Sequence, residues 1–403
     1  MRHYFFALIV LAMAITAAEP VQLSIDATKE TGEARPRVGF LGGLRDEIPD
    51  STIQPLHPTL WRIGHQFRGR IKSGLNGAID RVSVLGATYK LVMSDLIDSK
   101  PQTDWTKYED DVKKLVREVG PRAKTIIWEP VNEPDCSHKP IDKYYELYGH
   151  AFKALREAEP AALICGPGFA FPNFEKYRVF LDYCRDHKLE CNYLAWHFTG
   201  WDPNYPEQAK WKLGDMRQFI AQYPEQKIRE IHCDEWGAGP DKPGRLHPGR
   251  AVVWFHYLEN VYKVDRACRA NWGKEDDYLG GIVTLKGETY PVYHAYRLYG
   301  QMTGKMLSVS GNSSTLACLA AKNKDALQIL VGSIRKGQEQ VVLEIKGFKG
   351  KIETAQMIPG KDLNTPLTTL PPLNAKLEQR NGAVRITLDM EENQACFLVL
   401  KPE

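Results

Sequence analysis

The sequence predicts a (β/α)8 TIM barrel followed by a small all-β sandwich. Short apolar segments alternate with amphipathic ones over residues 30–300, and short alternating runs fill residues 301–403. Strands that alternate with helices form a parallel sheet, and eight such units close into a barrel. A chain of 403 residues is long enough for a barrel and a second, smaller domain.

The first 18 residues have the pattern of a secretory signal. Arg2 and His3 precede an apolar stretch from Tyr4 to Ile15, and small residues follow up to Ala18. This stretch is too short to span a bilayer, and no second long apolar run follows it. We therefore expect cleavage near Ala18, a secreted or periplasmic protein, and no membrane partner.

Eight segments are predicted as barrel strands because each is short, apolar and bounded by turn or helix signals. They are Arg37–Leu41, Leu60–Gly64, Lys90–Met93, Thr125–Trp128, Leu163–Cys165, Tyr193–Trp196, Glu230–Cys233 and Gly281–Leu285. An earlier segment, Val21–Ile25, alternates apolar and polar residues like an edge strand, and it is a candidate to pair with the sandwich.

Helical patterns separate most of these strands. The clearest runs from Asp104 to Glu118, where apolar residues recur at three- and four-residue steps and Gly120-Pro121 follows. The others are Ile141–Glu159, Phe174–His187, Glu207–Gln222 and Arg250–Ala270. The stretch from Lys72 to Lys90 is weakly patterned, so the second crossover carries no firm prediction.

The helical spacing stops near Met302. Alternating runs separated by turn clusters such as Asn381-Gly382 then predict an all-β module. The predicted strands are Thr315–Ala320, Ala326–Val331, Val341–Ile345, Ile352–Met357, Ala383–Leu388 and Ala395–Leu400.

Charge and cysteine content exclude several classes of function. The net charge of +3 is too small to predict binding to nucleic acid. The eight cysteines show no CxxC or Cys/His ligand spacing, so we expect no metal site and no cofactor. In an exported protein Cys184 could pair with Cys191, or Cys318 with Cys396, and both possibilities stay open.

Two segments about a hundred residues apart carry the candidate chemistry. One is Trp128–Pro134 and the other is Ile231–Gly237. Each begins as a buried strand and delivers a glutamate, Glu133 or Glu235, at its C-terminal end, which is the catalytic face of a barrel. A pair of carboxylates is what hydrolysis of a glycosidic bond requires.

These motifs resemble clan A of the retaining glycoside hydrolases. The spacing Glu129-x-x-Asn132-Glu133-Pro134 is most similar to family 39, the β-xylosidase and α-L-iduronidase family. Gly166-Pro167, His197 and the segment Tyr290–Tyr296 add to the resemblance, which spans roughly residues 37–300. The resemblance implies a carbohydrate substrate, a barrel and a trailing β-sandwich.

The resemblance also implies residue roles. Glu133 would be the acid/base, Glu235 the nucleophile, and Asn132 a ligand of the sugar hydroxyl beside the anomeric carbon. Arg62 would keep the nucleophile ionised, because a nearby guanidinium lowers the pKa of a carboxylate. Carboxyl groups of a retaining pair lie about 5–5.5 Å apart, and we expect that separation here.

Further substrate contacts are predicted less directly. His197 and His65 follow strands on the same face, Asp95 ends a strand and Trp236 follows the second glutamate. Trp236 is a candidate stacking platform, together with Trp201 and Trp211. Each of these residues also has a structural alternative: a satisfied strand-end histidine, a solvated loop aspartate or core packing of the tryptophans. Glu129 should point into the barrel and form an ion pair, with Arg62 as the candidate partner.

The chain departs from the clan pattern at three places. Phe198 and Thr199 stand where a tyrosine is frequent, Thr284-Leu285-Lys286 where a tryptophan is frequent, and Cys233-Asp234 precedes the second glutamate. These departures leave the sugar open. A non-catalytic glycan-binding barrel is the main alternative from another class. A metal-dependent hydrolase is disfavoured, because the opening His-x-His of such barrels is absent.

Overall fold

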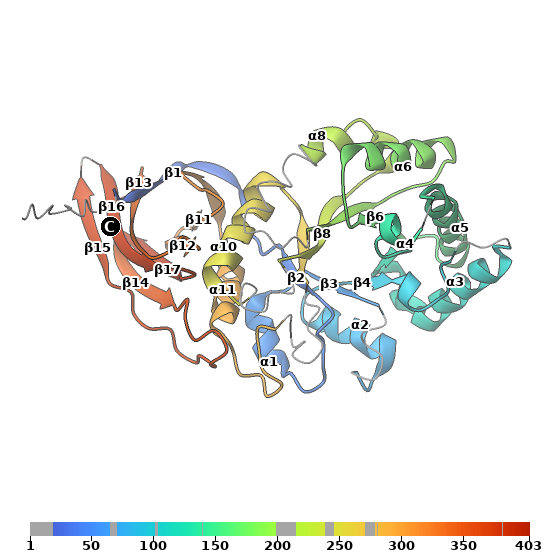
Figure 1. The fold of residues 1–403 in the computed structure, drawn as a ribbon, viewed down its shortest axis with the longest axis horizontal. Coiled ribbons are helices and arrows are strands. Elements are labelled where there is room, and N and C mark those ends of the chain that lie inside the picture. The colour runs from blue at the N-terminus through green and yellow to red at the C-terminus, as the bar shows by residue number, and fades with distance from the viewer. Residues whose placement is uncertain are drawn as a thin grey trace, which may run out of the picture.

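The computed structural model describes residues 19–64, 71–100, 104–138, 140–198, 215–237, 246–270, 279, 281–380 and 382–403. Two β-assemblies dominate it: a closed barrel of eight parallel strands and a separate nine-stranded sheet. Figure 1 shows the barrel with its helices beside the curved sheet, with α10 and α11 between them. The predicted fold class is confirmed. The predicted signal segment, residues 1–18, lies outside the described residues.

The barrel strands follow one another around the barrel in chain order. They are β2 (Val38–Leu41), β3 (Leu60–Ile63), β4 (Thr88–Val92), β5 (Ile127–Glu129), β6 (Leu163–Phe169), β7 (Tyr193–Phe198), β8 (Glu230–Trp236) and β9 (Arg266–Arg269). Nearly every residue in them is buried, which explains their almost continuous apolar runs.

The eighth strand lies elsewhere than predicted. The barrel closes through β9, which pairs with β2 and β8, while Gly281–Leu285 forms a turn region with one isolated bridge at Val283. The predicted helix Arg250–Ala270 also ends early: α10 runs to His256, a π-helical segment continues to Val261, and β9 begins at Arg266. Strand β9 is only four residues long and has an arginine at each end, so it shows no apolar run. The sequence pattern therefore predicts it as part of the preceding helix.

Helices connect the strands and cover the barrel. They are α1 (Asp50–Ile53), α2 (Gly74–Val84), α3 (Thr106–Val119), α4 (Pro134–Ser137), α5 (Asp142–Ala158), α6 (Phe174–Asp186), α8 (Met216–Ile220), α10 (Pro248–His256) and α11 (Pro291–Gly300). Helix α2 fills the second crossover, which the sequence left open. Half of the predicted helix Glu207–Gln222, residues 207–214, lies outside the described residues, and α8 forms in the other half.

The second sheet has the order β14-β17-β12-β11-β10-β1-β13-β16-β15. Its strands are β1 (Val21–Glu33), β10 (Lys305–Ser310), β11 (Leu316–Lys322), β12 (Leu327–Ser333), β13 (Gln338–Lys346), β14 (Gly350–Ile358), β15 (Ala375–Arg380), β16 (Ala383–Glu391) and β17 (Ala395–Pro402). Strand β1 precedes the barrel in the chain, yet it lies inside this sheet, antiparallel to β10 and parallel to β13.

The curved sheet encloses its own apolar core and packs on the barrel with its other face. Leu23, Leu343 and Leu398 belong to the enclosed core. Ala317 and Leu330 face the other way and join the barrel core. Both faces of β11 and β12 are therefore buried. Helix α10 packs against these two strands, and α11 also contacts the sheet, at β14.

The cysteines are all free. Cys318 and Cys396 both lie opposite Val331 on the intervening strand β12, so two strand spacings, about 10 Å, separate them. A disulfide needs Cα atoms within about 7 Å. Cys184 and Cys191 are buried as thiols, and the Cys191 thiol donates to the carbonyl of Tyr193 at 3.0 Å.

None of the helices in the described part of the chain combines the length and hydrophobicity that a bilayer-spanning helix requires.

The contact between α10 and the sheet depends on two glycines. A Cβ added to Gly249 would lie 2.1 Å from the carbonyl oxygen of Ser333, and one added to Gly332 would lie 2.5 Å from the Cβ of Val252. We predict that Gly249→Ala lowers the free energy of unfolding by about 1–3 kcal/mol, because the backbones must separate. Urea unfolding measures it. The control Gly32→Ala, which meets nothing within 4 Å, should change stability by less than about 0.5 kcal/mol. Equal stability of the two variants would contradict this packing.

Candidate active site

The two glutamates reach the same end of the barrel from different strands. Glu133 follows β5 by four residues and adopts a left-handed backbone conformation with φ 46°, immediately before Pro134 begins α4. Such a conformation is uncommon for a residue with a side chain and is found where structure demands a particular side-chain direction. The turn directs Glu133 toward the barrel axis instead of along the helix.

Glu235 lies within β8, close to its end. Strand β8 changes register against β7 between Trp196 and His197, and against β9 between Cys233 and Trp236. Such irregularities re-aim side chains and are common beside active sites. Here the irregularity aligns Glu235 with His197 of the neighbouring strand.

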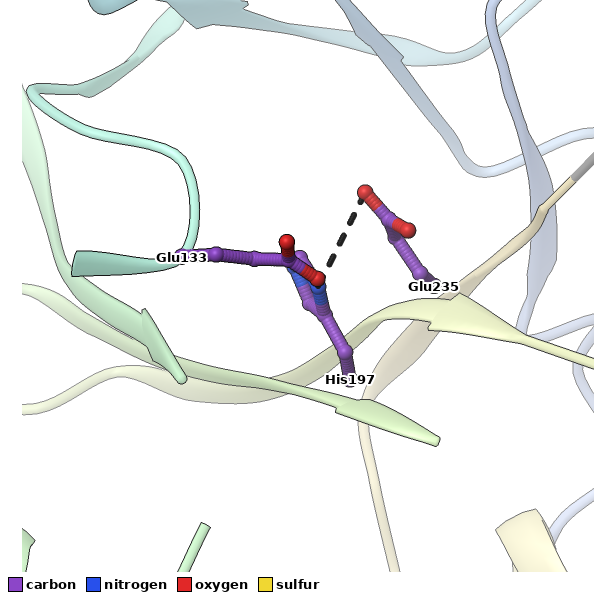
Figure 2. Close-up of side chains that lie close together, drawn as sticks. All are labelled: Glu133, His197 and Glu235. Carbon is purple, nitrogen blue, oxygen red and sulfur yellow. Dashed lines mark hydrogen bonds and ion pairs between the residues drawn. The ribbon is translucent and has the colours of Figure 1, made fainter. Parts of the chain in front are cut away.

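Glu133, His197 and Glu235 form one cluster. Figure 2 shows the two glutamates approaching from different elements, with the imidazole beside both. His197 Nδ1 lies 2.9 Å from Glu133 Oε1 and 3.7 Å from Glu235 Oε1. One ligand oxygen from each carboxylate and this nitrogen all lie within 4.8 Å of one another.

The guanidinium of Arg62 joins this cluster to the barrel interior. Arg62 donates from Nη1 to Glu235 Oε1 at 2.8 Å and from Nη2 to Asn132 Oδ1 at 2.7 Å. Its Nε and Nη2 also donate to the two oxygens of Glu129 at 2.7 Å each. The Glu129–Arg62 pair follows the sequence prediction. Both side chains are almost completely buried, so each depends on the other for compensation of its charge.

A second buried pair lies next to the first. Lys90 of β4 bonds to Asp234 of β8, and neither side chain is exposed. Asp234 Oδ2 also lies 3.8 Å from Arg62 Nε. Sequence reasoning missed this pair, although a lysine inside an otherwise apolar strand segment was a usable signal. Barrel interiors are usually filled by branched apolar side chains, so the ionic interior is a specific feature of this chain.

The pKa directions of the two glutamates differ from the expectation. Burial raises the pKa of Glu235 above its ordinary value, and this outweighs the lowering by His197 and Arg62. The hydrogen bond from His197 lowers the pKa of Glu133 against the effect of burial. Burial opposes the imidazolium, but Glu235 and Glu133 together raise the pKa of His197. In the free protein the cluster therefore favours an ionised Glu133.

Glycines at two strand ends make room for the site. Gly168 pairs with Asn132 in an isolated bridge, and a Cβ on it would lie 3.0 Å from Glu129 Oε1 and 3.2 Å from His197 Nε2. A Cβ on Gly64 would lie 1.8 Å from Asp95 Oδ2. Asp95 thus packs against the end of β3.

The remaining predicted contacts have different outcomes. Trp236 is fully buried among Trp254 and Tyr296, with ring centroids 5.6 and 6.1 Å away, so the prediction of a sugar platform is wrong for this residue. The alternation of β8 directs it outward into the layer of helices, while Glu235 points inward. His65, Trp201 and Trp211 lie outside the described residues.

Glu133, His197 and Glu235 are also the donor set that a divalent cation would require. The surroundings oppose that use. Arg62 already donates to Glu235, and His197 Nδ1 is hydrogen-bonded to Glu133, so a cation would have to displace one interaction and approach a guanidinium. Carboxylates held by a guanidinium and an imidazole suit proton transfer and nucleophilic attack better than metal binding.

Comparison with known proteins places the fold. No family model and no curated protein matches the chain, whereas solved structures do. N2152 from Neocallimastix frontalis matches 96% of this chain and 100% of its own, with 18% identity and a TM-score of 0.79. The GH39 enzyme from Xanthomonas axonopodis pv. citri matches 98% and 100%, with 12% identity and a TM-score of 0.66.

A monomeric beta-xylosidase from Caulobacter crescentus CB15 matches 95% of this chain and 99% of its own, with 13% identity and a TM-score of 0.68. The chain therefore shares the fold of these solved structures. The matches cover both the barrel and the sheet, so the shared arrangement extends over nearly the whole chain. At these identities the likeness concerns architecture, and the chemistry rests on the side chains described above.

Arg62→Met tests the site and the barrel together. Arg62 is buried, so its loss leaves Glu129 without its guanidinium partner and leaves Glu235 with His197 alone. We predict a loss of about 3–5 kcal/mol in the free energy of unfolding. The control Arg122→Met removes a solvent-exposed pair with Asp80 and should cost at most about 1 kcal/mol. Urea unfolding of both variants decides, and equal small losses would refute the buried network as a structural support.

Proposed function

We propose that the protein is a retaining glycoside hydrolase that acts on an oligosaccharide or polysaccharide. The observation that carries the proposal is the meeting of Glu133 and Glu235, with ligand oxygens within 4.8 Å, at the C-terminal ends of the fourth and seventh barrel strands. This closeness favours the retaining separation of about 5–5.5 Å over the wider inverting one of about 6.5–9.5 Å.

In the first step Glu235 attacks the anomeric carbon while Glu133 protonates the departing oxygen. Glu235 is the better nucleophile of the two, because it is buried and fixed by Arg62 Nη1 at 2.8 Å. Glu133 is more exposed, with 28% of its side chain accessible, and can exchange protons with the leaving group and with water. Asn132, held by Arg62, is placed to bind a sugar hydroxyl beside the reacting carbon.

In the second step Glu133 deprotonates a water molecule that attacks the glycosyl-enzyme. Glu235 departs as a carboxylate, and the anomeric configuration of the substrate is retained. The Arg62 guanidinium stabilises the negative charge that returns to Glu235.

The productive protonation state has the proton on Glu133 and the charge on Glu235. The pKa directions of the free protein favour the reverse, because His197 donates to Glu133 while burial raises the pKa of Glu235. Coupled groups titrate as a set. A leaving-group oxygen that accepts a hydrogen bond from Glu133 stabilises its protonated form, so substrate binding shifts the proton to where the reaction needs it.

The substrate class follows from fold and site together. Structures that share the fold include a beta-xylosidase, which favours a β-linked pentose or hexose as the first sugar to test. The N-terminal pattern of the sequence supports export, which suits an extracellular polysaccharide or its fragments. A non-catalytic glycan-binding barrel is the alternative. Hydrolysis of a glycoside that is lost when either glutamate is removed distinguishes the hydrolase from this binding protein.

We predict that Glu235→Ala abolishes turnover of aryl glycosides, because no glycosyl-enzyme can form. Glu133→Ala should slow unactivated glycosides by roughly 10²–10⁴-fold but spare the first step with activated aryl leaving groups, and azide should then raise the rate. The control Glu175→Ala changes an exposed pair with Arg178 and should keep wild-type kinetics. A panel of aryl glycosides followed by absorbance measures these effects. Wild-type turnover in both site variants would favour the glycan-binding alternative.

We also predict that His197→Gln moves the whole pH–rate profile to higher pH. His197 lowers the pKa of both Glu133 and Glu235, so a neutral side chain lets both rise. The acidic limb, which needs charged Glu235, and the alkaline limb, which needs protonated Glu133, should then shift in the same direction. The pH dependence of kcat/KM measures the shift. Movement of one limb alone would mean that His197 acts on only one of the two carboxyl groups.

A further inference from the structure

One exposed aromatic ring lies on the catalytic side of the barrel. Phe171 is 63% exposed, and it is the only aromatic residue among the exposed large hydrophobic residues in the described part of the chain. It follows β6 by two residues, so it lies beyond the C-terminal end of that strand, where the active site is. Isolated exposed apolar residues are ordinary on protein surfaces, so exposure alone implies nothing.

The backbone at Phe171 is fixed by a buried carboxylate. The Asp135 side chain, only 5% exposed, accepts hydrogen bonds from the amides of Ala170 and Phe171, each at 3.0 Å. Lys176 donates to Asp135 Oδ2 at 2.6 Å and to the Phe171 carbonyl at 2.7 Å. Its ammonium also lies 5.5 and 6.0 Å from the rings of Phe169 and Phe171. The backbone that carries the exposed ring is therefore held at both its amide and its carbonyl.

This anchoring ties Phe171 to the acid/base side of the site. Asp135 is two residues beyond Glu133, in the short helix α4. Phe171 is three residues beyond Gly168, whose own position lies against Glu129 and His197. Three residues span at most about 10 Å, so the ring is within reach of a sugar next to the reacting bond. The group that Glu133 protonates is the leaving group, so this side of the bond is the leaving-group side.

We propose that Phe171 is the stacking platform for the sugar that leaves. The proposal rests on the proposed function and specifies its substrate as a bond between two sugars, with a pyranose ring on the leaving side. An aromatic face packs against the C–H surface of a pyranose and provides a large contact area. Because the loop is already fixed, little conformational entropy is lost when the sugar binds.

The test compares two substrates that share the glycone and differ only in the ring of the leaving group. For the sugar identified by the aryl glycoside panel, these are the methyl glycoside and the disaccharide; in the xylose series they are methyl β-xyloside and xylobiose. Both leaving groups are unactivated alcohols that need the proton of Glu133. We expect Phe171→Ala to lower the ratio of kcat/KM for disaccharide over methyl glycoside by roughly tenfold.

Two further variants make the result specific. Phe171→Trp should keep the ratio, because it retains an aromatic face. Val179→Ala removes another exposed apolar side chain, on helix α6, and should also keep the wild-type ratio. An unchanged ratio in Phe171→Ala, with activity present, overturns the platform but not the hydrolase. Absence of activity in the wild-type protein on the whole panel overturns the proposed function and the platform with it.

Discussion

The position of one guanidinium determines how the site is built. Arg62 leaves the end of β3 and bonds to Glu129 on β5, to Asn132 in the following loop and to Glu235 on β8. A single buried cation therefore fixes the relative positions of β5, the loop that follows it and β8. Because an unpaired charge in this position costs several kcal/mol, the carboxylates and the arginine must assemble together. The geometry of the proposed catalytic groups is thus fixed by the same interactions that stabilise the barrel interior.

The neighbouring pair of Lys90 and Asp234 adds one positive and one negative charge to the barrel interior. Without it, Asp234 would compete with Glu235 for Arg62, from which it lies 3.8 Å away. Arg62 is shared between Glu129 and Glu235, while Asp234 is paired with Lys90. Burial raises the pKa of Glu235, and the neighbouring carboxylates of Glu133 and Glu129 raise it further. His197 supplies the remaining positive charge, shared between Glu235 and Glu133. The site is an array of charges in which each proton position depends on the others.

The chain contributes strands to the sandwich both before and after the barrel. Strand β1 enters the second sheet before the barrel begins, and the remaining strands follow after α11. Gly249 and Gly332 then allow α10 and the sheet to approach closely. The face of the second sheet that is turned toward α10 therefore belongs to the same hydrophobic core as the barrel. The candidate leaving-group platform at Phe171 lies on a different part of the barrel, beyond β6.

The sequence by itself determined the barrel class, seven of the eight barrel strands and the two glutamates, because buried parallel strands are local apolar runs and each glutamate lies within a few residues of the end of one. It also indicated the Glu129–Arg62 pair from the alternation of a strand. Only the tertiary structure decided the eighth strand, since β9 is four residues long and ends in arginines. It likewise revealed that Trp236 lies in the hydrophobic core and that Lys90 pairs with Asp234. It also decided the pKa of Glu235, which burial raises more than Arg62 lowers it. Those outcomes depend on which distant side chains meet and how much water they exclude, and no local pattern encodes either quantity.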